Sequence, residues 1–168
     1  MRVLLASLCA TAFAASVLHP APALAAESTL TGDMSGFNYL LGEPWGCTTS
    51  VPAMGDQPAR TDVLTVAFDV APRNVLHDHV SGDNYMGDDY FGYSTDMSNY
   101  WSTSATNGAT HEFATSTDGK TFTGTSWMGS TTMSVTNTYT KVGDNAVKMH
   151  QVVSVGGRQL NFDSTCTR

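Results

Sequence analysis

From Trp45 onward, hydrophobic and polar residues alternate in short segments that turn-forming residues separate. Between residues 131 and 141, for example, Met133, Val135 and Tyr139 share one face of an extended chain, while threonine and serine occupy the other. A period of two is typical of half-buried β-strands. About ten strands are therefore predicted, near residues 45–52, 61–70, 73–80, 84–93, 97–106, 109–116, 120–128, 131–141, 146–155 and 158–167.

The turns between these segments are short, and no crossover helix separates them. Asn107-Gly108, Asp118-Gly119 and Gly156-Gly157 are typical hairpin turns, because their residues tolerate positive φ. Tightly connected strands favour an antiparallel up-and-down order, and about ten such strands are expected to curl into a closed barrel that removes the exposed edges. Before the first strand, residues 27–35 are expected to be loosely ordered, and residues 37–42 to form a short helix or turn.

The N-terminus has the order of a secretory signal. Met1 and Arg2 precede an uncharged apolar run, and Ala23-Leu24-Ala25 offers a small-residue cleavage site. The alternative is a membrane anchor, but the run is shorter than the ~20 residues that a spanning helix needs. We therefore expect a signal peptide over residues 1–25 and a single β-barrel domain over residues 26–168, in the periplasm of a bacterium or secreted from it.

Three cysteines occur in the chain, and Cys9 would leave with the signal peptide. The remaining pair, Cys47 and Cys166, predicts one disulfide in an exported protein. Cys47 lies in the first predicted strand and Cys166 in the last. Because a disulfide needs Cα atoms within roughly 7 Å, and only closure makes the first and last strands neighbours, the pair also favours a closed barrel.

The net charge of the chain limits the classes of partner that we expect. Removal of residues 1–25 takes away Arg2 and no acidic residue, so the formal charge changes from −7 to −8. A negative surface argues against nucleic acid and anionic lipid as partners, and nothing after residue 25 is apolar enough to cross a membrane. A small-molecule ligand is the expected partner, and the sequence leaves the oligomeric state open.

Several segments resemble a known group of proteins. The stretch from Phe37 to Cys47 resembles the opening of calycin-like barrels, a leading helix followed by Leu-x-Gly-x-Trp, with Pro44 displacing the Trp by one place. Residues 89–124 and the Thr165–Arg168 tail resemble small secreted bacterial barrels of unknown function. The resemblance implies a calycin-type barrel, distantly similar to nitrobindins and fatty-acid-binding proteins. It also suggests haem, because nitrobindin-like proteins bind haem through a C-terminal histidine, for which His150 is the candidate.

Histidines offer a second hypothesis. His77 and His79 are two residues apart, so they share one face of a strand. Together with a third ligand, His150 or His111, they could hold zinc. The competing interpretation, which we favour, is that they are packed or solvent-facing histidines. Similarly, Asp83, Asp88 and Asp89 could offer oxygen ligands to calcium, although their spacing matches no known calcium loop and surface solvation is the simpler explanation.

No nucleophile elbow, P-loop or dinucleotide fingerprint occurs, so no catalytic residue is assigned. Aromatic residues and methionines are concentrated in the middle strands and could line an apolar lumen, or equally fill the core. The candidates for lumen contacts are Tyr85, Tyr90, Tyr93, Trp101, Phe113, Trp127, Met133, Tyr139 and Met149.

Three functions follow from this sequence. The leading hypothesis is a barrel that binds a small, apolar ligand in its lumen without catalysis. The first rival is a haem-binding, metal-binding or enzymatic barrel that uses His150, His77 or His79. The second rival is a structural or envelope-interaction protein with a filled core and no ligand.

Overall fold

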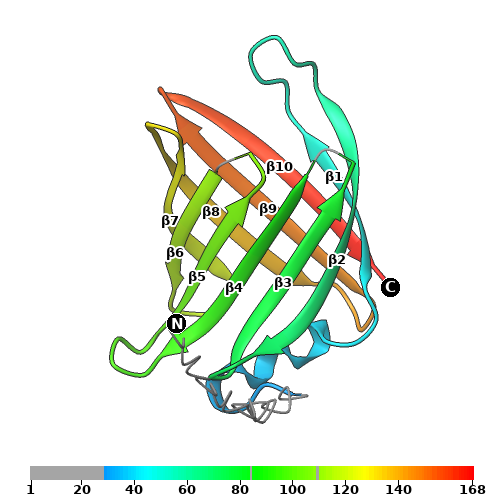
Figure 1. Cartoon of the computed structure of the whole chain (residues 1–168), viewed down its shortest axis with the longest axis vertical. Coiled ribbons are helices and arrows are strands. Elements are labelled where there is room, and N and C mark those ends of the chain that lie inside the picture. The colour runs from blue at the N-terminus through cyan, green and yellow to red at the C-terminus, as the bar shows by residue number, and fades with distance from the viewer. Residues whose placement is uncertain (1–28, 84, 109) are drawn as a thin grey trace, which may run out of the picture.

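Among the residues that the structure describes, ten antiparallel strands follow one another and one 3-10 helix precedes them (Figure 1). The structure is a computed structural model that describes residues 29–168 apart from residues 84 and 109. The predicted signal peptide therefore lies outside the described residues. The elements are η1(Gly32–Leu40), β1(Trp45–Val51), β2(Arg60–Ala71), β3(Val75–Gly82), β4(Met86–Ser94), β5(Asn99–Thr106), β6(Thr110–Ser116), β7(Thr121–Met128), β8(Thr131–Lys141), β9(Ala146–Val155) and β10(Arg158–Thr167).

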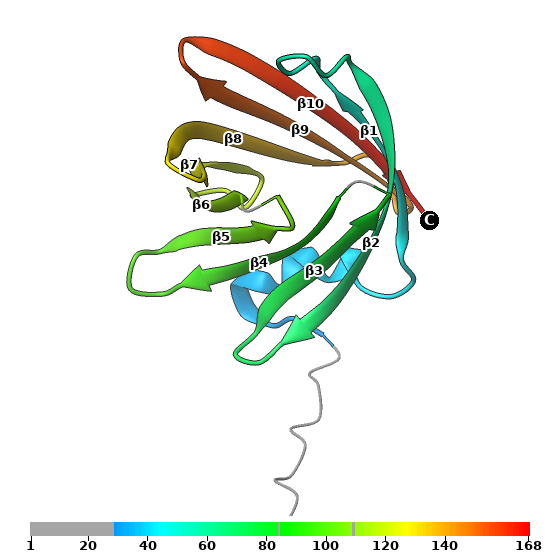
Figure 2. The same ribbon diagram turned by 45° about the horizontal axis from the view of Figure 1, so that its top comes forward.

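The sheet closes on itself. Each strand pairs with its neighbour in sequence, and β1 also pairs with β10, which makes an up-and-down barrel (Figure 2). The predicted fold class is confirmed, and every predicted strand boundary lies within two residues of the observed one. Two of the predicted hairpin turns show the expected backbone, because Gly119, Gly156 and Gly157 adopt positive φ. Asn107-Gly108 also lies in a turn, between β5 and β6, but Gly108 does not adopt positive φ. The turn between β2 and β3 is different, since there the non-glycine residues Arg73 and Asn74 adopt positive φ.

Alternation along the strands separates an interior from an outer face. In β1 the residues Trp45, Cys47, Thr49 and Val51 are buried and the three between them are exposed. Gly124 in β7 allows β6 to approach closely, because a Cβ at this position would collide with the backbone of Phe113 and Ala114.

Helix η1 covers one end of the barrel. Leu30, Met34 and Leu40 are buried there together with Trp45. The helix begins at Gly32, so the expectation of loose structure up to residue 35 is wrong for its last residues. Short-range patterns could not show this, because the segment is ordered by contacts with the barrel wall; the Tyr100 hydroxyl, for example, donates to the Asp33 carbonyl oxygen. Within the described residues, no helix is long and apolar enough to span a membrane.

The C-terminal residue ties the helix to the barrel. The guanidinium of Arg168 donates to the carbonyl oxygens of Leu41 and Tyr39, at 2.7 and 3.0 Å. The same group lies 4.5 Å from the centre of the Trp45 ring, a cation–π contact. Trp45 in turn donates its indole N–H to the Leu40 carbonyl oxygen at 2.9 Å. These contacts hold the segment Gly-x-x-Trp, residues 42–45, against the segment Thr-Cys-Thr-Arg, residues 165–168.

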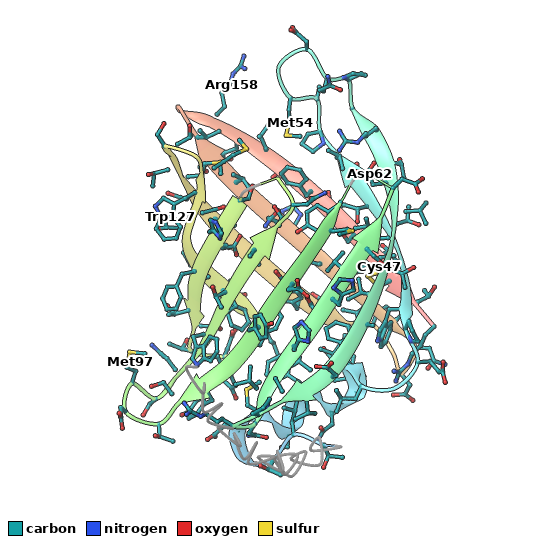
Figure 3. The ribbon with its side chains drawn as sticks, in the orientation of Figure 1. Cys47, Met54, Asp62, Met97, Trp127 and Arg158 are labelled. Carbon is teal, nitrogen blue, oxygen red and sulfur yellow. A yellow bond between two sulfur atoms is a disulfide. The ribbon has the colours of Figure 1, made fainter. Side chains whose placement is uncertain are left out.

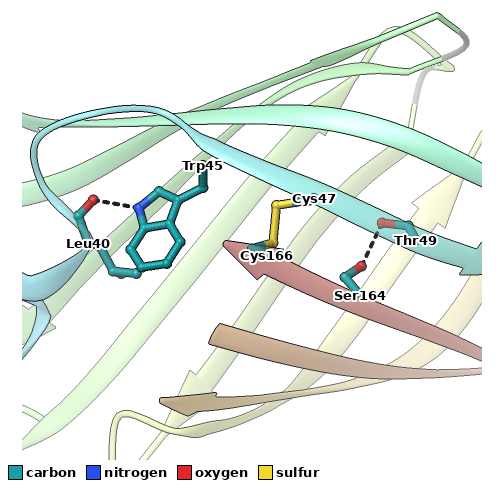
Figure 4. The surroundings of a disulfide bond; sticks show 6 residues. All are labelled: Leu40, Trp45, Cys47, Thr49, Ser164 and Cys166. Carbon is teal, nitrogen blue, oxygen red and sulfur yellow. Dashed lines mark hydrogen bonds between the residues drawn. A yellow bond between two sulfur atoms is a disulfide. The ribbon is translucent and has the colours of Figure 1, made fainter. Parts of the chain in front are cut away.

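A disulfide joins the two strands at which the barrel closes. Cys47 and Cys166 are directly opposite in the β1–β10 register, with their Cα atoms 4.0 Å apart. Two residues further along, the hydroxyls of Thr49 and Ser164 form a 2.7 Å hydrogen bond across the same pair of strands (Figure 4). The predicted pairing of the two cysteines, and its link with closure, agree with the structure.

Candidate functional site

The barrel encloses a cavity of about 650 Å³. It extends from Phe37 and Leu40 of helix η1 to the opposite end of the barrel, which we call the mouth and which Met54, Arg60 and Arg158 line. Figure 3 shows Met54 and Arg158 at this end, far from the helix. Helix η1 covers the other end, so the mouth is the natural route into the cavity.

Four of the nine predicted lumen residues line this cavity: Tyr85, Met133, Tyr139 and Met149. Tyr93 is instead half-buried at the closed end, where its ring packs against Tyr100. The other four side chains belong to the outer face, to which alternation assigns Tyr90, Trp101, Phe113 and Trp127.

Packing explains the outward aromatic residues. The ring of Trp101 lies directly over Gly92 on the neighbouring strand, where a side chain would collide with it. Tyr90 stacks on His77, with ring centres 4.6 Å apart. An aromatic ring can thus cover a glycine or a neighbouring ring on the outer face of a sheet, as well as fill its interior.

His77, His79 and His150, the main candidates for metal or haem ligands, lie on the outer face, and so does His111, the other candidate for a third ligand. His77 contacts the carboxylates of Asp69 and Asp88, at 3.0 and 3.1 Å, and His79 contacts Asp88 at 3.0 Å. His150 pairs with the exposed carboxylate of Asp163, at 2.7 Å. The structure therefore does not bring His150 together with the His77/His79 pair, and none of the three lines the cavity.

Carboxyl groups occupy the interior instead. Asp78 of β3 lies opposite Asp89 of β4, and Asp89 lies opposite Ser104 of β5. Ser104 in turn lies opposite Glu112 of β6. All four residues line the cavity, and together they form a polar row across four consecutive strands.

Burial raises the pKa values of the three carboxyl groups in this row. Burial raises the pKa of Glu112 to about 7, against the hydrogen bond from Asn137, which lowers it. Burial also raises the pKa of Asp89 to about 6. The pKa of Asp78 is raised well above its ordinary value, first by burial and then by the charge of Asp89 beside it. A carboxyl held in a low-dielectric interior favours its neutral form.

Three polar groups complete the surroundings of the row. The side-chain amide of Asn137, in β8, donates to Oε1 of Glu112. Burial raises the pKa of the hydroxyls of Tyr85 and Tyr139, and the nearby charges of Asp78, Asp89 and Glu112 raise it further. We call Asp78, Asp89, Glu112 and Asn137 the carboxyl cluster.

Sequence reasoning did not identify this cluster, although a signal for it was present. Asp78 stands between Leu76 and Val80 in an alternating strand, so it has the phase of the apolar face. His77 and His79 have the opposite phase and lie on the outer face, so they give no indication that Asp78 points inward. Of the three aspartates considered for calcium, Asp89 faces inward and Asp88 outward, so the suggested calcium loop does not form.

Within the described residues, no group of three histidine, cysteine, aspartate or glutamate side chains is arranged to hold a metal ion. Comparison with known proteins adds no assignment: no protein-family model matches the chain, and no curated protein matches it significantly.

Replacing Glu112 by Gln should stabilise the protein at high pH. The folded-state pKa of about 7 lies above the ordinary 4.5, so the folded protein retains a proton that the unfolded chain releases, and stability is lost as pH rises from about 4.5 to 7. Gln stays neutral and can still accept the hydrogen bond from Asn137. Since each tenfold change in acidity constant corresponds to about 1.4 kcal/mol, the gain at pH 8 should be roughly 3 kcal/mol, with little change at pH 4.

Urea unfolding at a series of pH values measures this difference. Asp163→Asn, which removes an exposed carboxylate from the outer face, is the matched control and should not show the same dependence on pH. A Glu112→Gln effect of equal size at pH 4 and pH 8 would contradict the assignment of a raised pKa to Glu112.

Proposed function

We propose that this protein binds a small, mostly apolar molecule in the lumen of its barrel. The observation that carries the proposal is the cavity of about 650 Å³, since ligand pockets are typically about 300–1,000 Å³. Aliphatic and aromatic side chains supply much of its wall, including Phe68, Val153, Leu160 and Phe162. A core of this kind is unfilled, which argues against a purely structural barrel.

The closed antiparallel barrel with a short helix before its first strand is consistent with a calycin-like fold. We propose kinship with calycin-like barrels on this basis. The contact between Trp45 and Arg168 supports it, because it brings together the two segments in which the sequence resembles that group.

We also propose that the protein works outside the cytoplasm, as a bacterial periplasmic or secreted protein whose residues 1–25 are removed on export. The Cys47–Cys166 disulfide supports this location, because such bonds form and persist in oxidising compartments.

A second function is favoured by a different observation. A carboxyl group with a pKa of about 7, such as Glu112, can give and take a proton at neutral pH, as a general acid–base catalyst does. An enzyme built on this lumen would therefore use the carboxyl cluster rather than the outer-face histidines. The two functions differ in what happens to the ligand: a binding protein releases it unchanged.

Native mass spectrometry of the protein purified from the cells that produce it tests the proposal. We expect a species heavier than the polypeptide by the mass of one small molecule, which solvent extraction then recovers unchanged. Recovery of a chemically converted molecule would favour the enzyme. A protein that carries no molecule and binds none of the apolar fluorescent probe N-phenyl-1-naphthylamine would contradict both functions.

A pair of neighbouring substitutions localises the binding. Leu160 lines the cavity, whereas Asn161 is exposed on the outer face. Leu160→Trp should narrow the lumen and weaken binding of the probe at least tenfold, while Asn161→Trp should leave it unchanged. Equal effects of the two substitutions would place the probe outside the lumen.

A further inference from the structure

The wall of the cavity has two chemically different sides. Strands β3 to β6 contribute Asp78, Asp89, Ser104 and Glu112 beside a few apolar side chains, and β8 adds the amide of Asn137. Strands β2, β9 and β10 contribute mainly aliphatic and aromatic side chains, which include Val66, Phe68, Val147, Met149, Val153, Leu160 and Phe162. A molecule that fills this lumen would therefore meet an apolar surface on one side and a polar one on the other.

Two side chains of the polar side are deeply buried, and each has one oxygen atom without a hydrogen-bond partner. Asp78 is 6% exposed and Asn137 is 5% exposed, and Oδ1 of each, like Oδ1 of Asp89, has no hydrogen-bond partner. With Glu112 ionised, its contact with Asn137 sets the orientation of the amide, because only the amide nitrogen can donate to a carboxylate. Its carbonyl oxygen is then left as a free acceptor on the wall of the cavity.

When Asp78 and Asp89 are ionised, all the free atoms are acceptors, which determines what could satisfy them. A buried acceptor without a partner costs about 1–3 kcal/mol, so a ligand with N–H donors would gain from meeting them. Among the described residues that line the cavity, the only cationic side chains are Arg60 and Arg158, both at the mouth. Arg60 is already paired with Asp62, at 2.9 Å.

We propose that the lumen binds a small organic cation, an apolar body that carries a protonated amine, and that Asp78, Asp89 and the Asn137 carbonyl oxygen hold the ammonium group. This inference rests on the proposed function and names the chemistry of its ligand. An ammonium group supplies three donors, which matches the three free oxygens. The aliphatic and aromatic side of the wall receives the apolar body. Glu112 lies next to Asn137 and adds negative charge.

The acidity of the cluster predicts how binding depends on pH. Asp78, Asp89 and Glu112 face the site from β3, β4 and β6, and the hydroxyls of Tyr85 and Tyr139 face it as well. On the outer face behind them, Asp88 and His77 also act on Asp89. Because Asp89 and Glu112 ionise only as pH rises through about 6 and 7 respectively, a cation should bind more tightly at pH 8 than at pH 5.

Three ligands of matched chain length test the inference: n-octylamine, 1-octanol and octanoate, titrated into the full protein by calorimetry at pH 8. We expect octylamine to bind at least tenfold more tightly than the alcohol, and octanoate to bind most weakly. Asp78→Asn and Asp89→Asn should each weaken octylamine binding about tenfold and leave octanol binding unchanged. Asp163→Asn, the control on the outer face, should change neither.

The outcomes separate the inference from the function on which it rests. If none of the three ligands binds, binding of small apolar molecules in the lumen is itself wrong. If octanol and octanoate bind as tightly as octylamine, the lumen binds apolar molecules and the amine assignment is overturned. Octanol binding also shows that each variant is folded. If a variant does not fold, the pH dependence of octylamine binding to the wild-type protein is the test. An affinity that does not increase from pH 5 to pH 8 overturns the inference.

Discussion

Removing the disulfide by replacing Cys47 and Cys166 together with Ala should lower the free energy of unfolding by about 4–5 kcal/mol in the chain-entropy model. The bond joins residues 119 positions apart, so it confines nearly the whole described chain in the unfolded state. Strand content should not change, because the backbone hydrogen bonds between β1 and β10 do not depend on the sulfur atoms. Guanidinium unfolding followed by far-ultraviolet circular dichroism measures both quantities.

Wild-type protein reduced with dithiothreitol should show the same loss as the double variant, because both lack the covalent link. Thr49→Val combined with Ser164→Ala is the matched control, since it removes a hydrogen bond between the same two strands and should cost only about 0.5–1.5 kcal/mol. A thiol count on unfolded, unreduced protein gives an independent result: two free thiols at Cys47 and Cys166 would show that the bond is absent.

Replacing Trp45 by Ala should cost about 3–5 kcal/mol, as is typical for large aromatic residues in a core. Trp45 is 1% exposed, and its loss would leave a hole at the closed end of the barrel. The Leu40 carbonyl oxygen would lose its donor, and Arg168 would lose the ring on which it lies. The same unfolding experiment applies.

Trp127→Ala is the control, because it removes the same side chain from the outer face, where Trp127 is 40% exposed. Its cost should be about 1 kcal/mol or less. Trp45→Phe retains most of the buried surface but not the indole N–H, so it should fall between the two. Similar losses for Trp45→Ala and Trp127→Ala would show that the closed end contributes little to stability.

The strands and turns could be predicted because their determinants are local. Alternation in segments such as residues 131–141 defines strands, and pairs such as Asp118-Gly119 define turns. Closure is a long-range property, yet the positions of Cys47 and Cys166 predicted it. The order of residues 32–35 could not be predicted in this way, since tertiary contacts such as that of Asp33 with Tyr100 produce it.

The candidate site was harder to predict for a physical reason. Many of these strands carry threonine or serine on both faces, so hydrophobicity alone does not reveal which face is inside. Aromatic residues do not identify the inner face either, because some of them lie outside; Trp101, for example, covers Gly92 on the outer face. The position of Asp78 is better predicted from the residues two places before and after it. Leu76 and Val80 are apolar and buried, so Asp78, which shares their face, is inside as well, although its own side chain is polar.

The up-and-down strand order has a consequence for how the chain folds. Every strand interface except that between β1 and β10 joins strands adjacent in sequence, so most of the sheet can zip up hairpin by hairpin with short loop closures. The last step is non-local, and until β10 arrives the curled sheet has two unpaired edges that could recruit strands from other chains. If the disulfide between Cys47 and Cys166 forms at that stage, it makes the pairing of β1 with β10 hard to reverse. It would then also shorten the period in which the unpaired edges can aggregate.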